Sequence, residues 1–150
     1  MTLWNKKRRV MRHYDQSAKV YDTQYTEEQE AKIRVALDNL TLNQDSVILD
    51  AGCGTGLLFE HIAERTRFIV GTDISIGILN EAKKKAKTYK NVALIRADAD
   101  NMPFPNQSFD AVFAITLLQN TPNPLATLNE IKWVSKSNAT IIVTGLRKAF

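Results

Sequence analysis

Glycines and an aspartate follow the first strongly apolar run of this 150-residue chain, and they are the residues best suited to chemistry. The apolar residues 47–49 lead into Asp50 and then into a turn with glycine at positions 52, 54 and 56. Glycine carries no Cβ, so the backbone can turn sharply and a ligand can approach main-chain N–H groups. The apolar segment after the turn predicts a helix whose positive end faces the same place. This order of strand, glycine turn and helix predicts a nucleotide-type site.

More aspartates follow the next two apolar runs. Asp73 ends the run 68–73, and Asp98 and Asp100 follow the run 92–96. The carboxyl ends of parallel strands meet at one edge of a sheet, so we expect these side chains to lie near the glycine turn. A carboxylate in the place of Asp73 accepts hydrogen bonds from a ribose diol. That indicates an adenosine ligand, without distinguishing NAD from others.

The turn and the charges around it favour one adenosine ligand. A dinucleotide fold has G-x-G-x-x-G, but the position of its third glycine is Leu57 here. The turn contains no Lys or Arg, so a pyrophosphate would meet the aspartates unfavourably. S-adenosylmethionine has a cationic sulfonium, an ammonium that needs acceptors, and one carboxylate that can face the helix N-terminus. For Asp100 a purely structural role, ending a strand or capping a helix, stays open.

Alternating strands and helices are predicted to position these groups. We expect strands at 47–50, 68–73, 92–96, 109–115 and 139–144. We expect helices from Thr26, in a capping box with Gln29, to about 42, over 57–66, from Ser75 to 87, and from Asn123 to 134. Such alternation predicts an α/β fold, a Rossmann-like doubly wound parallel sheet with helices on both faces. The Lys83–Lys87 run is expected to be a solvated helix face, with Glu81 pairing with Lys85.

Composition limits the function class. With 44% hydrophobic residues the chain can bury one core, so we expect one domain. A net charge of +4 is too mild to indicate a nucleic-acid binder by itself. The single cysteine excludes an intrachain disulfide and predicts a cytoplasmic setting. No apolar run approaches the roughly 18 residues of a membrane helix, and the basic segment 6–9 lacks the apolar core of a signal peptide.

Several blocks of the chain, in this order, resemble the class I S-adenosylmethionine-dependent methyltransferases, in particular the ubiquinone-biosynthesis type. The resemblance covers about residues 14–145, and the blocks are VILDAGCGTG at 47–56, GTDIS at 71–75, RADA at 96–99 and MPFPNQSFD at 102–110. It implies a lid or tail segment at 1–25, which such enzymes fold over the cofactor, and a cofactor-binding methyltransferase domain at 26–150. Such folds usually have two further strands, so the sheet is expected to lack its last two, and we favour truncation. A minimal domain completed by a dimer or a partner at the exposed fifth strand is the alternative.

The resemblance also implies site residues. Those expected to bind the cofactor are Tyr14, Tyr21, Asp50, Gly52, Cys53, Gly54, Gly56, Asp73, Ile74, Asp98, Ala99, Thr116 and Gln119. Asp73 would hold the ribose, Ile74 and Asp98 the adenine, and Thr116 and Gln119 would border the methyl group. His13, which lies in the lid-like segment and could face the substrate, and Gln119 are weak catalytic candidates. Relatives often have histidines where this chain has the neutral Gln119-Asn120, which weakens the assignment of a base there. His61 is expected to be structural. We assign no metal ligands from the sequence.

The acceptor is hardly readable from the sequence. The absence of an Asn-Pro-Pro-aromatic segment favours a small molecule, while the basic segment 6–12 keeps an RNA or protein acceptor open. The leading hypothesis is methyl transfer by in-line displacement to an O, N or C nucleophile. Its rivals are a catalytically idle module that binds the cofactor or a partner, and an NAD-dependent oxidoreductase.

Overall fold

A five-stranded parallel sheet forms the centre of the computed structural model, which describes residues 2–145. The strand order is β3-β2-β1-β4-β5. The strands are β1 (Val47–Ala51), β2 (Phe68–Asp73), β3 (Val92–Arg96), β4 (Phe109–Ile115) and β5 (Ser135–Thr144). All four neighbouring pairs are parallel. The α/β Rossmann-like fold predicted from the sequence is confirmed, and β5 begins four residues before the predicted position 139.

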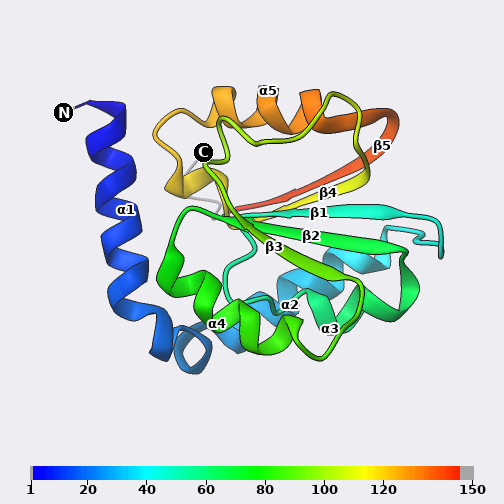
Figure 1. Ribbon diagram of the computed structural model, residues 1–150, viewed down its shortest axis with the longest axis horizontal. Coiled ribbons are helices and arrows are strands. Elements are labelled where there is room, and N and C mark those ends of the chain that lie inside the picture. Colours follow the sequence, from blue (N-terminus) through cyan, green and yellow to red (C-terminus); the bar gives the residue numbers. More distant parts are fainter. Residues whose placement is uncertain (1, 146–150) are drawn as a thin grey trace.

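Helices cover both faces of the sheet, as Figure 1 shows. The helices α2 (Tyr21–Asp38), α3 (Phe59–Ile62) and α4 (Ile76–Ala86) pack on one face, where Ile33, Phe59 and Ala82 join Ile48 and Phe113 in one buried cluster. On the other face, α5 (Pro124–Val134) packs Ile131 and Val134 against Leu49 and Val112. Because successive strand residues point to opposite faces, the apolar run of β1 feeds both clusters.

The N-terminal segment is helical and stands across the carboxyl ends of the strands (Figure 1). It comprises α1 (Leu3–Ser17) and the short 3-10 helix η1 (Ala18–Val20). No residue of α1 is buried, so this helix is not held by an apolar core. Polar contacts to the loops beyond β2, β3 and β4 hold it instead.

Two predictions about the N-terminal half are wrong. Helix α2 begins at Tyr21, directly after η1, and Thr26 lies inside it with Oγ1 donating to the Asp22 carbonyl. The expected capping box at Thr26 therefore does not exist, because the helix already started one turn earlier. The predicted helix 57–66 is only the four-residue α3 followed by the 3-10 helix η2 (Ala63–Arg65). The expected division between residues 25 and 26 falls within α2.

The lysine run at the end of α4 is also paired differently from the prediction. Glu81 pairs with Lys84, at 2.9 Å. Lys85 instead reaches Asp22 of α2 at 2.5 Å and donates to the Thr55 carbonyl at 3.0 Å. The run therefore ties α4 to α2 and to the glycine turn. No helix within residues 2–145 is both long and apolar enough to span a membrane.

Candidate functional site

A cleft of about 750 Å³, counting its open mouth, lies at the carboxyl edge of the sheet beneath α1. Ligand sites of open α/β sheets lie at this edge. The residues lining it come from α1, α2 and α4, from the end of β4, and from the segments after β1, β2, β3 and β4. They are Lys7, Val10, Tyr14, Tyr21, Gly52, Gly54, Asp73, Ile74, Ile78, Ala97, Asp98, Ala99, Ile115, Thr116, Leu117, Asn120, Thr121 and Pro122.

The glycine turn forms the floor of the cleft, and its glycines differ in what they face. All three have positive φ, at 67° for Gly52, 57° for Gly54 and 85° for Gly56. A Cβ on Gly56 would lie 2.5 Å from the ring of Phe59, and one on Gly52 would lie 2.7 Å from Leu117. A Cβ on Gly54 would meet no protein atom within 4 Å. Gly54 therefore leaves open a space that a ligand can enter.

Asp73 joins the end of β2 to this turn. Its Oδ2 accepts from Gly54 N at 3.1 Å, and its Oδ1 accepts from Ser75 N at 3.0 Å. Burial raises the pKa of Asp73, while these backbone N–H groups oppose that rise. Each carboxylate oxygen has two lone pairs, so acceptor capacity remains for a ligand hydroxyl.

Asp50 and Cys53 lie behind the turn and line a second hollow of about 360 Å³. This hollow shares Tyr21, Gly52 and Gly54 with the cleft, so the two are contiguous. Burial, and next the charge of Asp73, raise the pKa of Asp50 to about 8. Burial likewise raises the pKa of the Cys53 thiol, which therefore stays neutral and serves packing rather than nucleophilic chemistry.

The helix α1 forms the roof of the cleft through three sets of polar contacts. Tyr14 Oη accepts from Asn120 Nδ2 at 2.9 Å. Asp15 Oδ1 accepts from Ser75 Oγ at 2.5 Å and from Gly77 N at 2.9 Å. Lys7 Nζ forms the third set with two aspartates, described next. Burial raises the pKa of Tyr14, so its hydroxyl is neutral at neutral pH.

Lys7 of α1 brings a cation to two of the aspartates at the edge of the sheet. Its Nζ lies 2.6 Å from Asp98 Oδ2 and 2.8 Å from Asp100 Oδ2. Partial burial lowers the pKa of Lys7, but the two carboxylates more than offset this and raise it above its usual value. Asp98 and Asp100 are therefore partly neutralised by Lys7, although the glycine turn itself contains no Lys or Arg. Asp50 and Asp73 keep no cation within ion-pair distance among residues 2–145.

Most of the predicted site residues meet in one place. Nine line the cleft, namely Tyr14, Tyr21, Gly52, Gly54, Asp73, Ile74, Asp98, Ala99 and Thr116. Asp50 and Cys53 line the second hollow, and Gly56 packs against Phe59. Gln119 lies half-buried in the 3-10 helix η3 (Leu118–Asn120), and His13 is exposed on α1; neither lines the cleft. The roles assigned to these residues stay predictions.

Sequence reasoning missed several lining residues. They are Lys7, Val10, Ile78, Leu117, Asn120 and Pro122. Ile78 could have been found, because it lies one turn into the helix that follows Asp73. No local signal marks Lys7 or Val10, since their partners are distant in sequence.

Comparison with known proteins agrees with this geometry. Residues 49–143 match the family model of the methyltransferase domain. A malonyl-[acyl-carrier protein] O-methyltransferase of Marinomonas sp. is 29% identical over 142 residues, which are 93% of this chain and 52% of that protein. A demethylmenaquinone methyltransferase of Staphylococcus saprophyticus is 32% identical over 109 residues, which are 71% of this chain and 47% of that protein. This chain thus spans about half of the length of these relatives.

Solved structures share the fold. A phosphoethanolamine N-methyltransferase of Haemonchus contortus matches with a TM-score of 0.85 at 19% identity, over 97% of this chain and 33% of the other. A methyltransferase of Haloferax volcanii, solved in complex with the activator Trm112, matches with a TM-score of 0.80 at 20% identity, over 87% of this chain and 58% of the other. The matched residues are more than half of the chain and include the glycine turn at the floor of the cleft. The chain therefore belongs to the class I S-adenosylmethionine-dependent methyltransferase family.

Proposed function

We propose that this chain binds S-adenosylmethionine in the cleft and transfers its methyl group to a small-molecule acceptor. The observation that carries the proposal is the pair formed by Asp73 and Gly54. One supplies a carboxylate at the end of β2, and the other leaves its Cβ direction open on the floor of the same cleft. S-adenosylmethionine needs both, because its ribose hydroxyls require an acceptor and its amino-acid part must pass close to the turn.

The surrounding residues suit the separate parts of the cofactor. Ile74, Ile78 and Ala97 give the adenine an apolar slot, with the Asp98 carboxylate at its edge. The second hollow, with Asp50 at its base, suits the amino-acid end, whose ammonium would replace the proton that burial favours on Asp50. The cofactor in this site supplies an electrophilic methyl group on a cationic sulfur.

The methyl end is lined by groups that position and exclude water rather than take up a proton. Tyr14, Thr116, Leu117 and Asn120 line this part of the cleft. The Tyr14 phenol is neutral and already bound to Asn120. We therefore propose that the acceptor arrives with a nucleophile that needs no strong base, and that alignment supplies most of the rate gain, an effect that can reach roughly 7–11 kcal/mol. Residues 1–25, which include α1, are proposed as the segment that closes over the site.

Isothermal titration calorimetry with S-adenosylhomocysteine and with NAD tests the cofactor. We expect S-adenosylhomocysteine to bind and NAD not to bind. Asp73→Asn should weaken binding by about 100-fold, because a charged hydrogen bond to the ribose is worth about 1.5–3 kcal/mol. Asp45→Asn, at an exposed carboxylate in the turn before β1, is the matched control and should bind normally. Binding of NAD instead would overturn the proposal.

Transfer of labelled methyl groups tests the reaction. Demethylmenaquinone and malonyl-acyl carrier protein are the first acceptors to try, because two relatives are named for acting on them. A small-molecule fraction, an RNA fraction and a protein fraction of a cell extract form the second set. Label in the small-molecule fraction is expected, whereas label in RNA or protein would assign the acceptor to that class. Fractionation of the cells tests the proposed cytoplasmic location.

A catalytically idle binding module is the second candidate. It is favoured by the neutral groups at the methyl end of the cleft. A partner or second copy would then dock along β5, where Ile141 and Val143 are each 41% exposed. Cofactor binding with no label in any fraction, together with a dimer or complex in size-exclusion chromatography, would support this candidate.

A further inference from the structure

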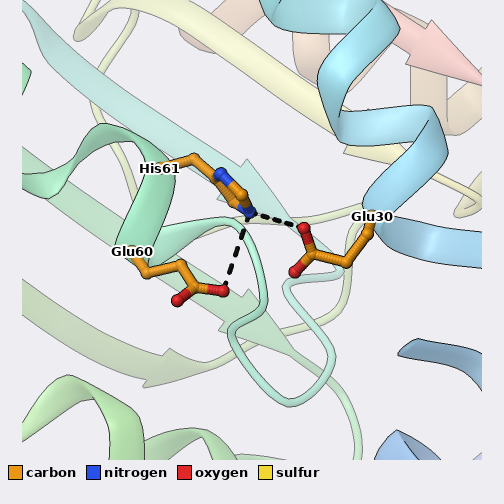
Figure 2. A group of neighbouring side chains, drawn as sticks. All are labelled: Glu30, Glu60 and His61. Atoms are coloured by element: carbon orange, nitrogen blue, oxygen red, sulfur yellow. Dashed lines mark ion pairs between the residues drawn. The ribbon is translucent and has the colours of Figure 1, made fainter. Parts of the chain in front are cut away.

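One histidine and two glutamates lie close together, as Figure 2 shows. Glu30 comes from α2, and Glu60 and His61 come from α3. None of the three lines the cleft, so the proposed methyl transfer does not use them. Glu30 is 31 positions away from His61, a separation that no sequence motif for a metal site would have shown.

The distances suit a shared ion. His61 Nε2 lies 2.9 Å from Glu30 Oε2 and 3.7 Å from Glu60 Oε1. One ligand atom from each of the three residues lies within 4.8 Å of the others. Ligands at about 2.0–2.1 Å around a tetrahedral zinc ion are separated by about 3.3 Å. The two separations from His61 stand on either side of that value, and the two carboxylate oxygens lie within 4.8 Å of each other, so side-chain rotations can bring the three ligand atoms around one ion.

The ring nitrogen itself is the second observation. His61 Nε2 is buried and makes no hydrogen bond with any described residue, although a carboxylate oxygen is near. In Figure 2 the nitrogen points between the two carboxylates rather than at either one. With the ring proton on Nδ1, the lone pair of Nε2 would be directed at the space that the two oxygens also border. The pair with Glu30 at 2.9 Å thus leaves the buried nitrogen without a well-aligned hydrogen bond, and a cation between the three groups accounts for that geometry.

We propose that Glu30, Glu60 and His61 form a zinc site that clips α2 to α3. One imidazole with two carboxylates suits Zn²⁺, whereas Mg²⁺ and Ca²⁺ prefer oxygen ligands alone. The Glu60 side chain is 61% exposed, so an ion can enter from solvent and keep a water as its fourth ligand. The neighbouring residue on α2, Gln29, lies 3.3 Å from Thr116 Oγ1, so the clip would also steady one wall of the cleft.

Zinc titration of the chelator-treated protein by calorimetry tests the site. We expect one ion per chain, and a melting temperature that rises by roughly 5–10 °C at 100-fold excess over the dissociation constant. His61→Ala should abolish this binding. Glu30→Gln should weaken it by at least the roughly 10-fold that loss of an outer-shell partner costs. His13→Ala, which removes the other histidine, is the matched control and should bind like the wild type.

Two outcomes would overturn the zinc site. Equal zinc binding by the wild type and His61→Ala would show that the ion binds elsewhere. No binding by a wild type whose stability nevertheless falls with His61→Ala would show that His61 serves as an ion-pair partner of Glu30 alone. If His61→Ala does not fold, His61→Gln and Glu60→Gln provide the same comparison, with circular dichroism reporting the fold.

Discussion

The floor and the roof of the cleft are built in different ways. The floor is the glycine turn with Asp73, held by backbone hydrogen bonds such as Cys53 N to Thr72 O at 2.7 Å, and backed by the buried ring of Phe59. The roof is α1, which buries no residue and is held by the side chains of Lys7, Tyr14 and Asp15. Packed backbone resists local opening, whereas a few polar contacts do not. The floor therefore provides a fixed shape and the roof provides access.

The largest effect is expected at Gly56, on the floor. Gly56→Ala should lower the free energy of unfolding by about 2–5 kcal/mol, because its Cβ would enter the Phe59 ring at a positive φ. Gly54→Ala should lower the free energy of unfolding by only about 1–2 kcal/mol, because the positive φ of this position is its only source of strain. It should nevertheless prevent S-adenosylhomocysteine from binding, because its Cβ would enter the cleft. Urea denaturation measures the free energy of unfolding of both variants, and calorimetry measures their binding of S-adenosylhomocysteine. Equal stability losses would mean that the turn is not packed as described.

Asp50, buried beneath the floor, should make stability depend on pH. Its pKa is about 8 in the folded chain against 3.8 as the ordinary value. The folded state therefore binds more protons than the unfolded state between these values, and stability falls as pH rises through that window, by at most about 1.4 kcal/mol per pH unit. Asp50→Asn should remove most of this slope. As the pH rises from 6 to 8, its free energy of unfolding should therefore rise by about 2–3 kcal/mol relative to that of the wild type. Asp45→Asn should leave the slope unchanged.

Loss of the contacts that hold α1 should lower the free energy of unfolding less than a change in the glycine turn does. Lys7→Met removes both ion pairs to Asp98 and Asp100, and we expect a loss of about 1–2 kcal/mol. The more sensitive measurement is trypsin cleavage at the remaining basic residues of α1, which should become several-fold faster. Lys84→Met, which removes the exposed pair with Glu81, is the control and should change neither quantity. Unchanged cleavage in Lys7→Met would show that α1 is held by other contacts.

The smallest change in stability is expected from Gly77→Ala, although it should free the roof. Alanine favours α4 by about 1 kcal/mol over glycine, but its Cβ would lie 2.9 Å from the backbone of Asp15. The gain in helix propensity and the clash with Asp15 should nearly cancel in the free energy of unfolding, while the clash pushes α1 away from α4. Trypsin cleavage of α1 should therefore rise with little change in melting temperature. A large loss of stability instead would mean that α1 cannot separate from α4.

The same contrast explains what sequence could predict. The first four strands, the glycine turn and Asp73 follow from residues adjacent in the chain, and their predicted positions are confirmed, whereas β5 begins four residues early. The contacts of α1 join residues far apart, as with Lys7 and Asp98 or Tyr14 and Asn120, so neither this helix nor its cation was expected. The prediction of a helix start at Thr26 was wrong because its capping pattern lies inside α2, which already begins at Tyr21.

The contact between Asp15 and α4 has one more consequence. Ser75 is the N-cap of α4, and Asp15 completes that cap by accepting from both Ser75 Oγ and Gly77 N. Withdrawal of α1 would leave these two donors to water. By thermodynamic reciprocity, any molecule that orders the start of α4 also favours the docked position of α1, and docking of α1 in turn strengthens that molecule's binding.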